Sequence, residues 1–477
     1  MRRLSQLRDD SGQVLVVAAL CMVALIAFVG LAVDIGSVRH EQRRLQNTAD
    51  AAALAAALEV RVCGSVHNCA AMQTAAQNAL VENGYTDKIA LITDCSGSPG
   101  SGLTLMVNNP TCLVKNLIGS DTSKPRYNYV ETQVSETAPL YFSRIFGYTG
   151  FSIKARAQAA RGIGGPCVYA LNPSASGALS VSIGLAFKSN CGIVVESSSP
   201  TSVNCLVGLG VTAPYVQVSP TGGGASLLCL GSTHVTQAPV PVPADPLAYL
   251  PVPPTANDPC GTSNGNVYNG SQSAVQLGLL AGLAGDVTFN PGVYCGGISI
   301  TAALLSNITF KPGTYILRNG PMFSLLGIPI GTTSGFTVTV PLLSSIVGNG
   351  VTFYNEGNAG SFSFSANSLP IQLSNFQLSA PTNGDYGGIL FYQAHKVTNT
   401  GTFLISLLKG SSMDGVIYMP DALVTYGVGV ISGASKYNGI VADRVQFTAN
   451  ILSVINNDYS TVQSGSPLGG DHSELVQ

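Results

Sequence analysis

The stretch FNPGVY, Phe289-Asn290-Pro291-Gly292-Val293-Tyr294, recurs 21 residues later as FKPGTY, Phe310-Lys311-Pro312-Gly313-Thr314-Tyr315. Runs of a Gly followed by apolar residues recur further along, at Gly388, Gly415 and Gly439. Periods of about 20–50 residues are typical of solenoids and stacked arrays. Pro starts a turn and the following Gly completes it, so each repeat supplies a corner and then a short apolar strand.

This pattern predicts that residues 162–465 form a mainly β domain, a right-handed parallel β-helix. One turn of such a helix cannot bury its own core, so the turns must stack. The alternative is a β-sandwich with irregular loops. The Pro-rich stretch at 238–254 (APVPVPADPLAYLPVPP) favours an extended conformation; it either leaves and rejoins one β-helix, the interpretation we favour, or separates two β units. Residues 466–477 are predicted to be a flexible tail.

The composition excludes several classes of protein. Charged residues make up 10% of the 477 residues, and 22 Lys and Arg face 24 Asp and Glu. A nucleic-acid-binding protein needs a dense basic surface, and a disordered chain needs low hydrophobicity and high net charge. Only one long uncharged apolar run occurs, which argues against a polytopic transporter. We therefore expect no nucleic acid among the partners, and a membrane-tethered chain with a large β-rich part.

That run is Val14 to Val33, 20 residues without charge or Pro. A helix of this length spans about 30 Å, the thickness of the hydrocarbon core. The alternatives are a buried core helix and a cleaved signal peptide, whose apolar region is normally shorter. We expect an uncleaved transmembrane anchor. Arginines flank both ends, so the positive-inside rule nearly cancels; the weakly charged, Cys-containing bulk suits export and places residues 1–13 in the cytoplasm as an N-terminal tail.

Beyond the anchor, residues 34–60 are predicted to continue the helix outward as a stalk, because the run is Ala-rich and Ala has the highest helix propensity. Its small face at Ala52, Ala55 and Ala56 suits close approach of another helix or simply makes a stiff rod. Residues 61–161 are predicted to form a small α+β module. It would contain a helix at 70–81, stopped by Asn-Gly, several strands, and an aromatic turn leading into a strand with Ala at alternate positions.

The segment Gly12 to Leu58 resembles the N-terminal module of TadE/TadG-like proteins of the bacterial tight-adherence (Flp) pilus system. The resemblance rests on the Gly-Gln pair at 12–13, the GLAVDIG stretch at 30–36, and LQNTADAAAL at 45–54. It implies a single-pass inner-membrane protein with its bulk periplasmic or extracellular, other pilus-assembly subunits as partners, and a role in pilus assembly or surface adhesion.

One short motif suggests a metal site. Asp94, Ser96 and Ser98 fit the DxSxS loop of von Willebrand A domains, which some TadG-type proteins carry, and their oxygens suit Mg²⁺. A long helix should follow this loop, but a Pro-Gly-Ser-Gly run follows instead. An ordinary turn is the favoured interpretation, and we expect no cofactor.

The cysteines predict disulfides. Cys21 lies in the anchor and is expected to be free, which leaves ten outside it, an even number that suits an exported chain. Close spacing favours the pairs Cys63–Cys69, Cys95–Cys112, Cys191–Cys205 and Cys260–Cys295. This leaves Cys167 to pair with Cys229.

The sequence favours a non-enzymatic protein. The five histidines are scattered, and the acids of the β region, Glu356, Asp385, Asp414, Asp421 and Asp443, are single. Glycoside hydrolysis needs two positioned carboxylates. The Asp443-Arg444 pair is expected to point to opposite faces of a strand.

We therefore expect a structural or assembly component of a tight-adherence pilus or a surface adhesin, whose Ser, Thr, Asn and Gly surface contacts glycans or other subunits. The alternatives are a membrane-anchored β-helix that binds or cleaves polysaccharide, and a metal-dependent adhesin that uses Asp94, Ser96 and Ser98.

Overall fold

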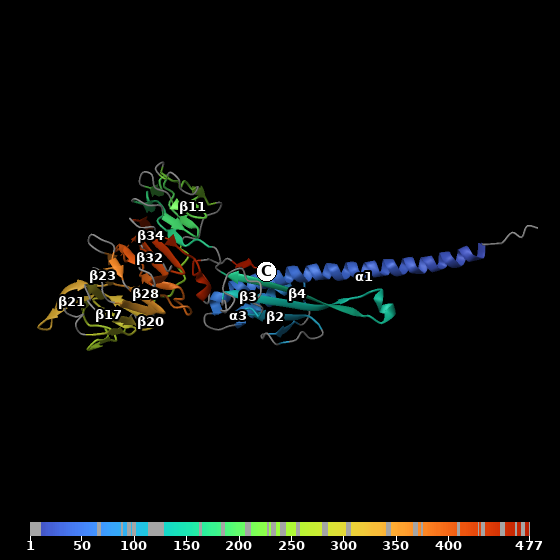
Figure 1. Ribbon diagram of the computed structural model, residues 1–477, viewed down its shortest axis with the longest axis horizontal. Helices are drawn as coiled ribbons and strands as arrows, with labels where there is room; N and C mark the ends of the chain where they lie inside the picture. The colour runs from blue at the N-terminus through green and yellow to red at the C-terminus, as the bar shows by residue number, and fades with distance from the viewer. Residues whose placement is uncertain are drawn as a thin grey trace, which may run out of the picture. The chain divides into compact units, whose positions relative to one another are not determined.

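The computed structural model describes residues 11–63, 68–86, 89–92, 97, 102–112, 128–161, 165–182, 187–205, 211–226, 229, 235–238, 245–253, 258–278, 285–301, 307–339, 345–365, 371–373, 375–407, 411–427, 429–430, 435–448, 454–462, 465–468 and 473–476. The chain divides into two compact units (Figure 1). The first comprises residues 1–125, 129–160 and 473–477, and the second comprises residues 126–128 and 161–472.

The first unit is built on one long helix. Helix α1 (Ser11–Leu58), blue in Figure 1, runs from the apolar stretch through the Ala-rich stretch without a break, as expected for a segment that contains no Pro. Two shorter helices follow, α2 (Val60–Cys63) and α3 (Ala70–Glu82). Helix α3 ends at Asn83, and Gly84 follows with a φ of +87°. This left-handed conformation favours Gly, so the predicted Asn-Gly stop is confirmed.

A five-stranded sheet covers α1 and α3. Its strands, in spatial order, are β1 (Ala90–Ile92), β2 (Thr104–Asn108), β3 (Tyr129–Pro139), β4 (Gly150–Arg161) and β36 (Ser473–Leu475). Strands β2, β3 and β4 are antiparallel neighbours. The alternate residues Ile153, Ala155, Ala157 and Ala159 of β4 are buried in the same core cluster as the Ala residues of α1. Small side chains on both surfaces let the helix lie close to the sheet.

The end of the chain differs from the prediction of a flexible tail. Strand β36 joins the sheet of the first unit, and the Val476 amide donates a hydrogen bond to the Gln158 carbonyl at 2.8 Å. Within the second unit, Leu468 is fully buried. A β edge offers backbone donors and acceptors to any short extended segment, so three residues are enough to form this strand. Such a short strand needs no long apolar run, and the sequence therefore does not predict it.

The second unit contains three rows of short parallel strands. Row 1 is β14 (Val267–Tyr268), β16 (Val287–Phe289), β19 (Asn307–Phe310), β24 (Ser345–Asn349), β28 (Asn375–Ser379) and the start of β32 (Ser412–Tyr426). Row 2 is β17 (Gly292–Cys295), β20 (Gly313–Arg318), β25 (Val351–Asn355), β29 (Ile389–Gln393), β32, β34 (Asn438–Phe447), β5 (Val168–Ala170), β8 (Ile193–Val195), β11 (Val216–Val218) and β12 (Val235–Gln237). Row 3 is β15 (Val275–Leu277), β18 (Ile298–Thr301), β23 (Phe336–Thr339), β26 (Phe362–Ser365), β30 (Gly401–Phe403), β32, β34, β6 (Leu179–Val181) and β9 (Val203–Cys205).

Smaller elements complete this unit. Strands β7 (Phe187–Ser189), β10 (Val211–Thr212) and β35 (Val454–Ile455) form one small sheet, and β27 (Ile371–Leu373), β31 (Ile405–Leu407) and β33 (Gly429–Val430) form another. Strand β13 (Ser263–Asn264) pairs antiparallel with β14, and β21 (Gly320–Leu325) with β22 (Ile328–Thr333) forms an inserted hairpin. Short 3-10 helices lie at Ser143–Phe146 in the first unit and Tyr459–Thr461 in the second.

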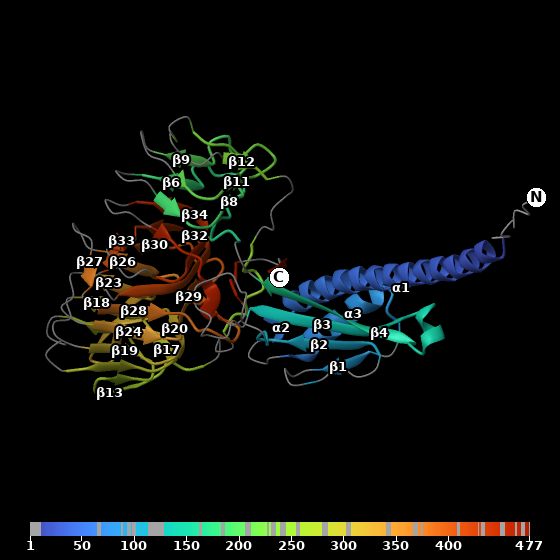
Figure 2. The same ribbon diagram turned by 45° about the vertical axis from the view of Figure 1, so that its right-hand side comes forward.

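The strands do not stack in the order of the sequence. Strand β34, near the end of the chain, pairs with β5 and β6, the first strands of the unit, through Ile440 opposite Val168 and Val445 opposite Leu179. Figure 2 shows the green strands β6, β8 and β11 next to the red β34, and the yellow β13 and β19 at the other end of the unit. The segment between β12 and β13, which contains the Pro-rich stretch, therefore connects the two ends of the rows.

The Pro-rich stretch is long enough for this return. Neighbouring strands lie about 4.8 Å apart, so row 2 extends roughly 40 Å, and an extended chain covers that with fewer than about twenty residues. Its described part, residues 245–253, lies against the strands: Leu247 is fully buried, and the Tyr386 hydroxyl donates to the Pro251 carbonyl at 2.9 Å. The interpretation that the stretch leaves and rejoins one β unit agrees with the single compact second unit.

The repeated sequence has a physical role at the corners. Phe289 and Phe310 are register partners in row 1 and stack with ring centroids 4.7 Å apart. The Tyr294 hydroxyl donates to the carbonyls of Tyr268 and Asn290 at 3.0 and 2.6 Å. The Tyr315 hydroxyl repeats this, with the carbonyls of Phe289 and Lys311 at 2.9 and 2.6 Å. In each repeat the tyrosine hydroxyl thus donates to the carbonyl four residues before it. It also donates to a carbonyl in the row 1 strand of the previous turn, β14 for Tyr294 and β16 for Tyr315.

The predicted fold class holds at the coarse level: an apolar N-terminal helix with a small α+β module, and a large mainly β unit. Pairing within the three rows is parallel, whereas the sheets of the alternative sandwich are antiparallel.

Candidate functional site

Helix α1 supplies an apolar surface that the first unit does not cover. The side chains from Val14 to Val29 are exposed, and the most apolar window of the helix has a mean hydropathy of 3.0. Within the described residues this is the one helix long and apolar enough to cross a membrane. Cys21 lies in this surface as a free, exposed thiol. These properties fit the predicted anchor at Val14 to Val33.

The Ala face of α1 is occupied by the chain itself. Ala49, Ala52 and Ala56 are fully buried in the cluster that contains Met72 and Leu80 of α3. The Thr132 hydroxyl of β3 donates to the Ala49 carbonyl at 2.9 Å. The predicted close helix contact therefore forms within the first unit, which makes this part of α1 a structural element rather than a docking site.

A chain of polar side chains lies where the Pro-rich stretch meets row 2. The Tyr418 hydroxyl donates to Asp245 Oδ2 at 2.6 Å, which leaves its oxygen as acceptor for His395 Nε2 at 3.2 Å. His395 Nδ1 lies 3.3 Å from Asp421 Oδ2. Burial, and then the Asp245 carboxylate, raise the pKa of Tyr418 above its ordinary value, so its hydroxyl keeps the proton that it donates. The arrangement holds the Pro-rich stretch against the strand row.

Glu196 lies within electrostatic reach of Asp245. Burial, and to a smaller extent the negative charge of Asp245, raise the pKa of the Glu196 carboxyl to about 8. Its Oε1 atom is buried and has no hydrogen-bond partner in the part of the chain that the structure describes. A carboxyl group that keeps its proton near neutral pH beside a second carboxylate is one requirement of acid–base chemistry. Neither Glu196 nor Asp245 lies in a sequence motif that indicates such chemistry.

The acids singled out in the sequence have local partners or lie at the surface. Glu356 pairs with Arg318, Asp421 with His395, and the Asp414 carboxylate accepts a hydrogen bond from the Lys436 amide, while Asp385 is exposed. The expectation for Asp443-Arg444 is wrong: Arg444 Nε lies 3.2 Å from Asp443 Oδ2. The two residues lie where β34 passes from row 2 to row 3, and this corner breaks the strand alternation.

Four disulfides lie within the described residues. Cys63–Cys69 and Cys260–Cys295 coincide with the predicted pairs. The predictions Cys191–Cys205 and Cys167–Cys229 are wrong, because the structure joins Cys167 to Cys191 and Cys205 to Cys229, each 24 residues apart. This spacing is close to the period of the repeats. Cys167 and Cys191 lie just before β5 and β8, which are neighbours in row 2, whereas Cys205 ends β9 and Cys229 lies outside the named strands. Closeness in the sequence alone does not predict these pairs. Cys112 is disulfide-bonded, and its predicted partner Cys95 lies outside the described residues.

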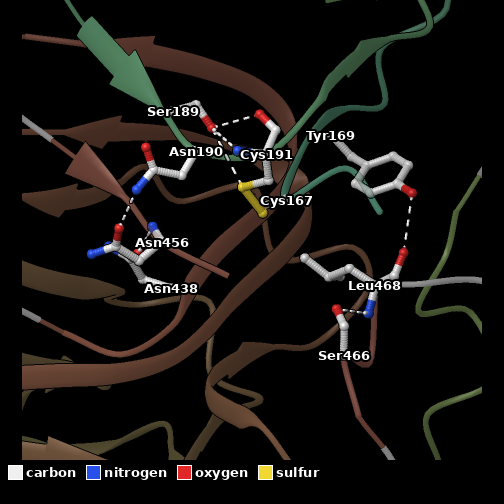
Figure 3. The surroundings of a disulfide bond; sticks show 9 residues. All are labelled: Cys167, Tyr169, Ser189, Asn190, Cys191, Asn438, Asn456, Ser466 and Leu468. Carbon is white, nitrogen blue, oxygen red and sulfur yellow. Dashed lines mark hydrogen bonds between the residues drawn. A yellow bond between two sulfur atoms is a disulfide. The ribbon is translucent and has the colours of Figure 1, made fainter. Parts of the chain in front are cut away.

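Figure 3 shows the Cys167–Cys191 bridge at the junction where the first strands of the unit meet the last. Asn190 donates to the Asn456 side chain at 2.6 Å, and the Asn456 amide donates to Asn438 Oδ1 at 2.7 Å. The Tyr169 hydroxyl donates to the Leu468 carbonyl at 3.2 Å. The bridge and these bonds fasten the two distant chain segments together.

The candidate metal ligands Asp94, Ser96 and Ser98 lie outside the described residues. Among those that are described, no group of three or more His, Cys, Asp or Glu could hold a metal ion.

The described architecture is that of a chain with one apolar N-terminal helix, suited to a membrane anchor, and a large disulfide-bonded β-rich unit. Residues 12–59, which comprise almost all of α1, match the family described as "Putative Flp pilus-assembly TadE/G-like". The chain thus carries a TadE/G-like domain in its N-terminal helix region. Neither curated proteins nor solved structures include a significant match.

Proposed function

We propose that the protein is a membrane-anchored structural or assembly component of a tight-adherence (Flp-type) pilus. The observation that carries this proposal is the coincidence of the TadE/G-like match at residues 12–59 with the helix whose apolar stretch suits a membrane span. The family description names pilus assembly, and a single apolar helix gives such a component its place in the membrane.

In this proposal the N-terminus is cytoplasmic and the two units lie in the periplasm or outside the cell. The disulfides support the placement, because such bonds persist in oxidising compartments. All four described bridges lie beyond the anchor, whereas Cys21 within it is free.

The large unit would be a right-handed parallel β-helix that acts by contact. The three rows of parallel strands support this fold, and connections between parallel strands are right-handed in nearly all proteins. The β21–β22 hairpin suits contact with another subunit, because its tip exposes Leu325, Leu326 and Ile328, with Leu326 96% exposed. Contacts with surface glycans through the polar side chains are a further part of the proposal.

We propose that the protein does not act as an enzyme. The one observation that favours a second function, polysaccharide cleavage, is the raised pKa of Glu196 next to Asp245. If these residues acted as acid and base, Glu196→Gln would abolish turnover of an acidic polysaccharide by the purified chain. If they have no catalytic role, neither wild type nor variant shows turnover.

The test is deletion of the coding sequence followed by complementation, with surface pili counted by electron microscopy. Wild-type protein should restore piliation. A variant with Leu326→Glu in the exposed hairpin should accumulate to the same level but restore fewer pili. Val81→Glu makes the same kind of change at an exposed apolar residue of α3 in the other unit, and it should restore piliation as wild type does. Normal piliation in the deletion strain would refute the proposed function.

A further inference from the structure

The hairpin of β3 and β4 runs alongside α1 (Figures 1 and 2). We call its end, residues 140–151, the aromatic tip, and hydrogen bonds attach it to α1. Asp34 of α1 accepts hydrogen bonds from the amides of Tyr141, Phe142 and Ser143 at 2.8, 3.1 and 2.7 Å, and from the Ser143 hydroxyl at 2.6 Å. Ser143 is the first residue of the short 3-10 helix Ser143–Phe146, and Tyr141 and Phe142 directly precede it. The Asp34 side chain thereby satisfies amides at the start of a helix, which have no partner within the helix.

A second contact lies one helical turn earlier. Gly30 is buried, and a Cβ atom at this position would lie 3.0 Å from Cγ of Phe142. The ring therefore packs onto the backbone of α1 where a side chain is missing. Both contacts are at Gly30–Asp34, the last turn of the apolar stretch Val14 to Val33, so the tip lies at one end of the proposed membrane span.

The tip exposes apolar side chains in this position. Those at least 43% exposed are Tyr141, Phe142, Ile145, Phe146, Tyr148 and Phe151. A cluster of this kind on a folded protein marks an interaction surface. Arg144 is also exposed within the tip, and a basic side chain can extend from an apolar surface toward lipid headgroups.

The occupant that fits this surface is the bilayer itself. The tip continues the exposed apolar surface of α1, which has Phe28 and Val29 just before Gly30. Amphipathic aromatic rings are enriched where a membrane protein meets the headgroup region. We propose that the aromatic tip inserts into the interfacial layer of the same bilayer that α1 crosses, at the Asp34 side, and gives the first unit a second point of membrane contact.

This inference rests on the proposed membrane anchor, and the experiment separates the two. The full chain is reconstituted in vesicles of phosphatidylcholine and phosphatidylglycerol with an environment-sensitive nitrobenzoxadiazole label. One sample carries the label on the native Cys21. The others carry Cys21→Ser with a single new cysteine, Phe146→Cys or Ile145→Cys in the tip, or Thr74→Cys on the exposed side of α3.

Lipids brominated on the acyl chains and aqueous iodide serve as quenchers. The inference predicts that labels at positions 21, 145 and 146 are quenched several-fold more by brominated lipid than by iodide, whereas the label at 74 shows the reverse. A lipid-shielded label at 21 with iodide-accessible labels at 145 and 146 overturns tip insertion and leaves the anchor intact. An iodide-accessible label at 21 overturns the anchor and the inference together. Tip labels protected from both quenchers indicate a protein cover and also overturn the inference.

Discussion

Removal of one hydroxyl group in Tyr315→Phe tests the role assigned to the repeated corner. The ring of Tyr315 is fully buried, and its hydroxyl donates to the carbonyls of Phe289 and Lys311. The variant keeps the ring and its packing but loses the hydrogen bonds of the hydroxyl. The Phe289 carbonyl still accepts a hydrogen bond from the Lys311 amide at 2.9 Å. A typical hydrogen bond contributes about 0.5–1.5 kcal/mol, so we expect the free energy of unfolding to fall by about that amount.

The assay is urea unfolding of the oxidised full chain, followed by far-UV circular dichroism. With an m-value of about 3 kcal/mol/M, the midpoint should fall by about 0.2–0.5 M. Tyr294→Phe makes the same change in the neighbouring repeat and should have a similar effect. Tyr148→Phe removes the hydroxyl of an exposed tyrosine and is the matched control. A Tyr315→Phe midpoint equal to that of the control would refute the account of the corner.

Three further predictions concern the second unit. Ser180→Cys with Gln446→Cys should form a disulfide, because these residues are register partners of β6 and β34 and adjacent strands lie at disulfide-compatible distances; mass spectrometry of the unreduced peptides detects it. Glu196→Gln should stabilise the chain increasingly from pH 4.5 to about 8, because the folded state holds a proton that the unfolded chain releases; urea midpoints across this range measure it. Tyr418→Phe should speed limited proteolysis of the Pro-rich stretch, because Asp245 loses its donor.

Each of these predictions has its own control. Asn204→Cys with Gln276→Cys joins positions that would approach only if the strands stacked in sequence order, so a disulfide there would contradict the described topology. Burial also raises the pKa of Asp414, so the Glu196→Gln variant keeps the part of the pH dependence that comes from Asp414. If the stability of the variant changed with pH as steeply as that of the wild type, Glu196 would not contribute. Wild-type proteolysis rates in Tyr418→Phe would mean that the other contacts alone hold the stretch.

Local features of this fold could be predicted from the sequence because they follow from neighbouring residues. The Ala-rich stretch without Pro predicts the continuous α1, and the spacing of the two FxPGxY repeats gives the register of Phe289 and Phe310. In row 2, however, Gly292 lies opposite Tyr315 rather than Gly313, a shift of two residues. A shift of two keeps every side chain on its face, so the apolar pattern cannot exclude it.

Long-range features could not be predicted in the same way. Sequence repeats show that strands stack but not in which order they stack. The pairing of β34 with β5 therefore cannot be predicted from the spacing of the repeats. The disulfide pairs are wrong for the same reason, because they depend on which strands are neighbours. Cys167 and Cys191 lie close together because β5 and β8 are adjacent in row 2. The sequence predicts the aromatic turn, but its contacts with Asp34 and Gly30 arise only when β3 and β4 lie along α1.

The most direct test of the account is the fate of each end of the native protein in bacterial cells. Sheared cells are converted to spheroplasts, treated with protease and separated into soluble, membrane and sheared-pilus fractions, with tags before α1 and after β36. The account predicts a carbonate-resistant membrane protein whose N-terminal tag survives while the C-terminal tag is digested. A chain found in the soluble fraction, or an N-terminal tag digested in intact spheroplasts, would contradict it.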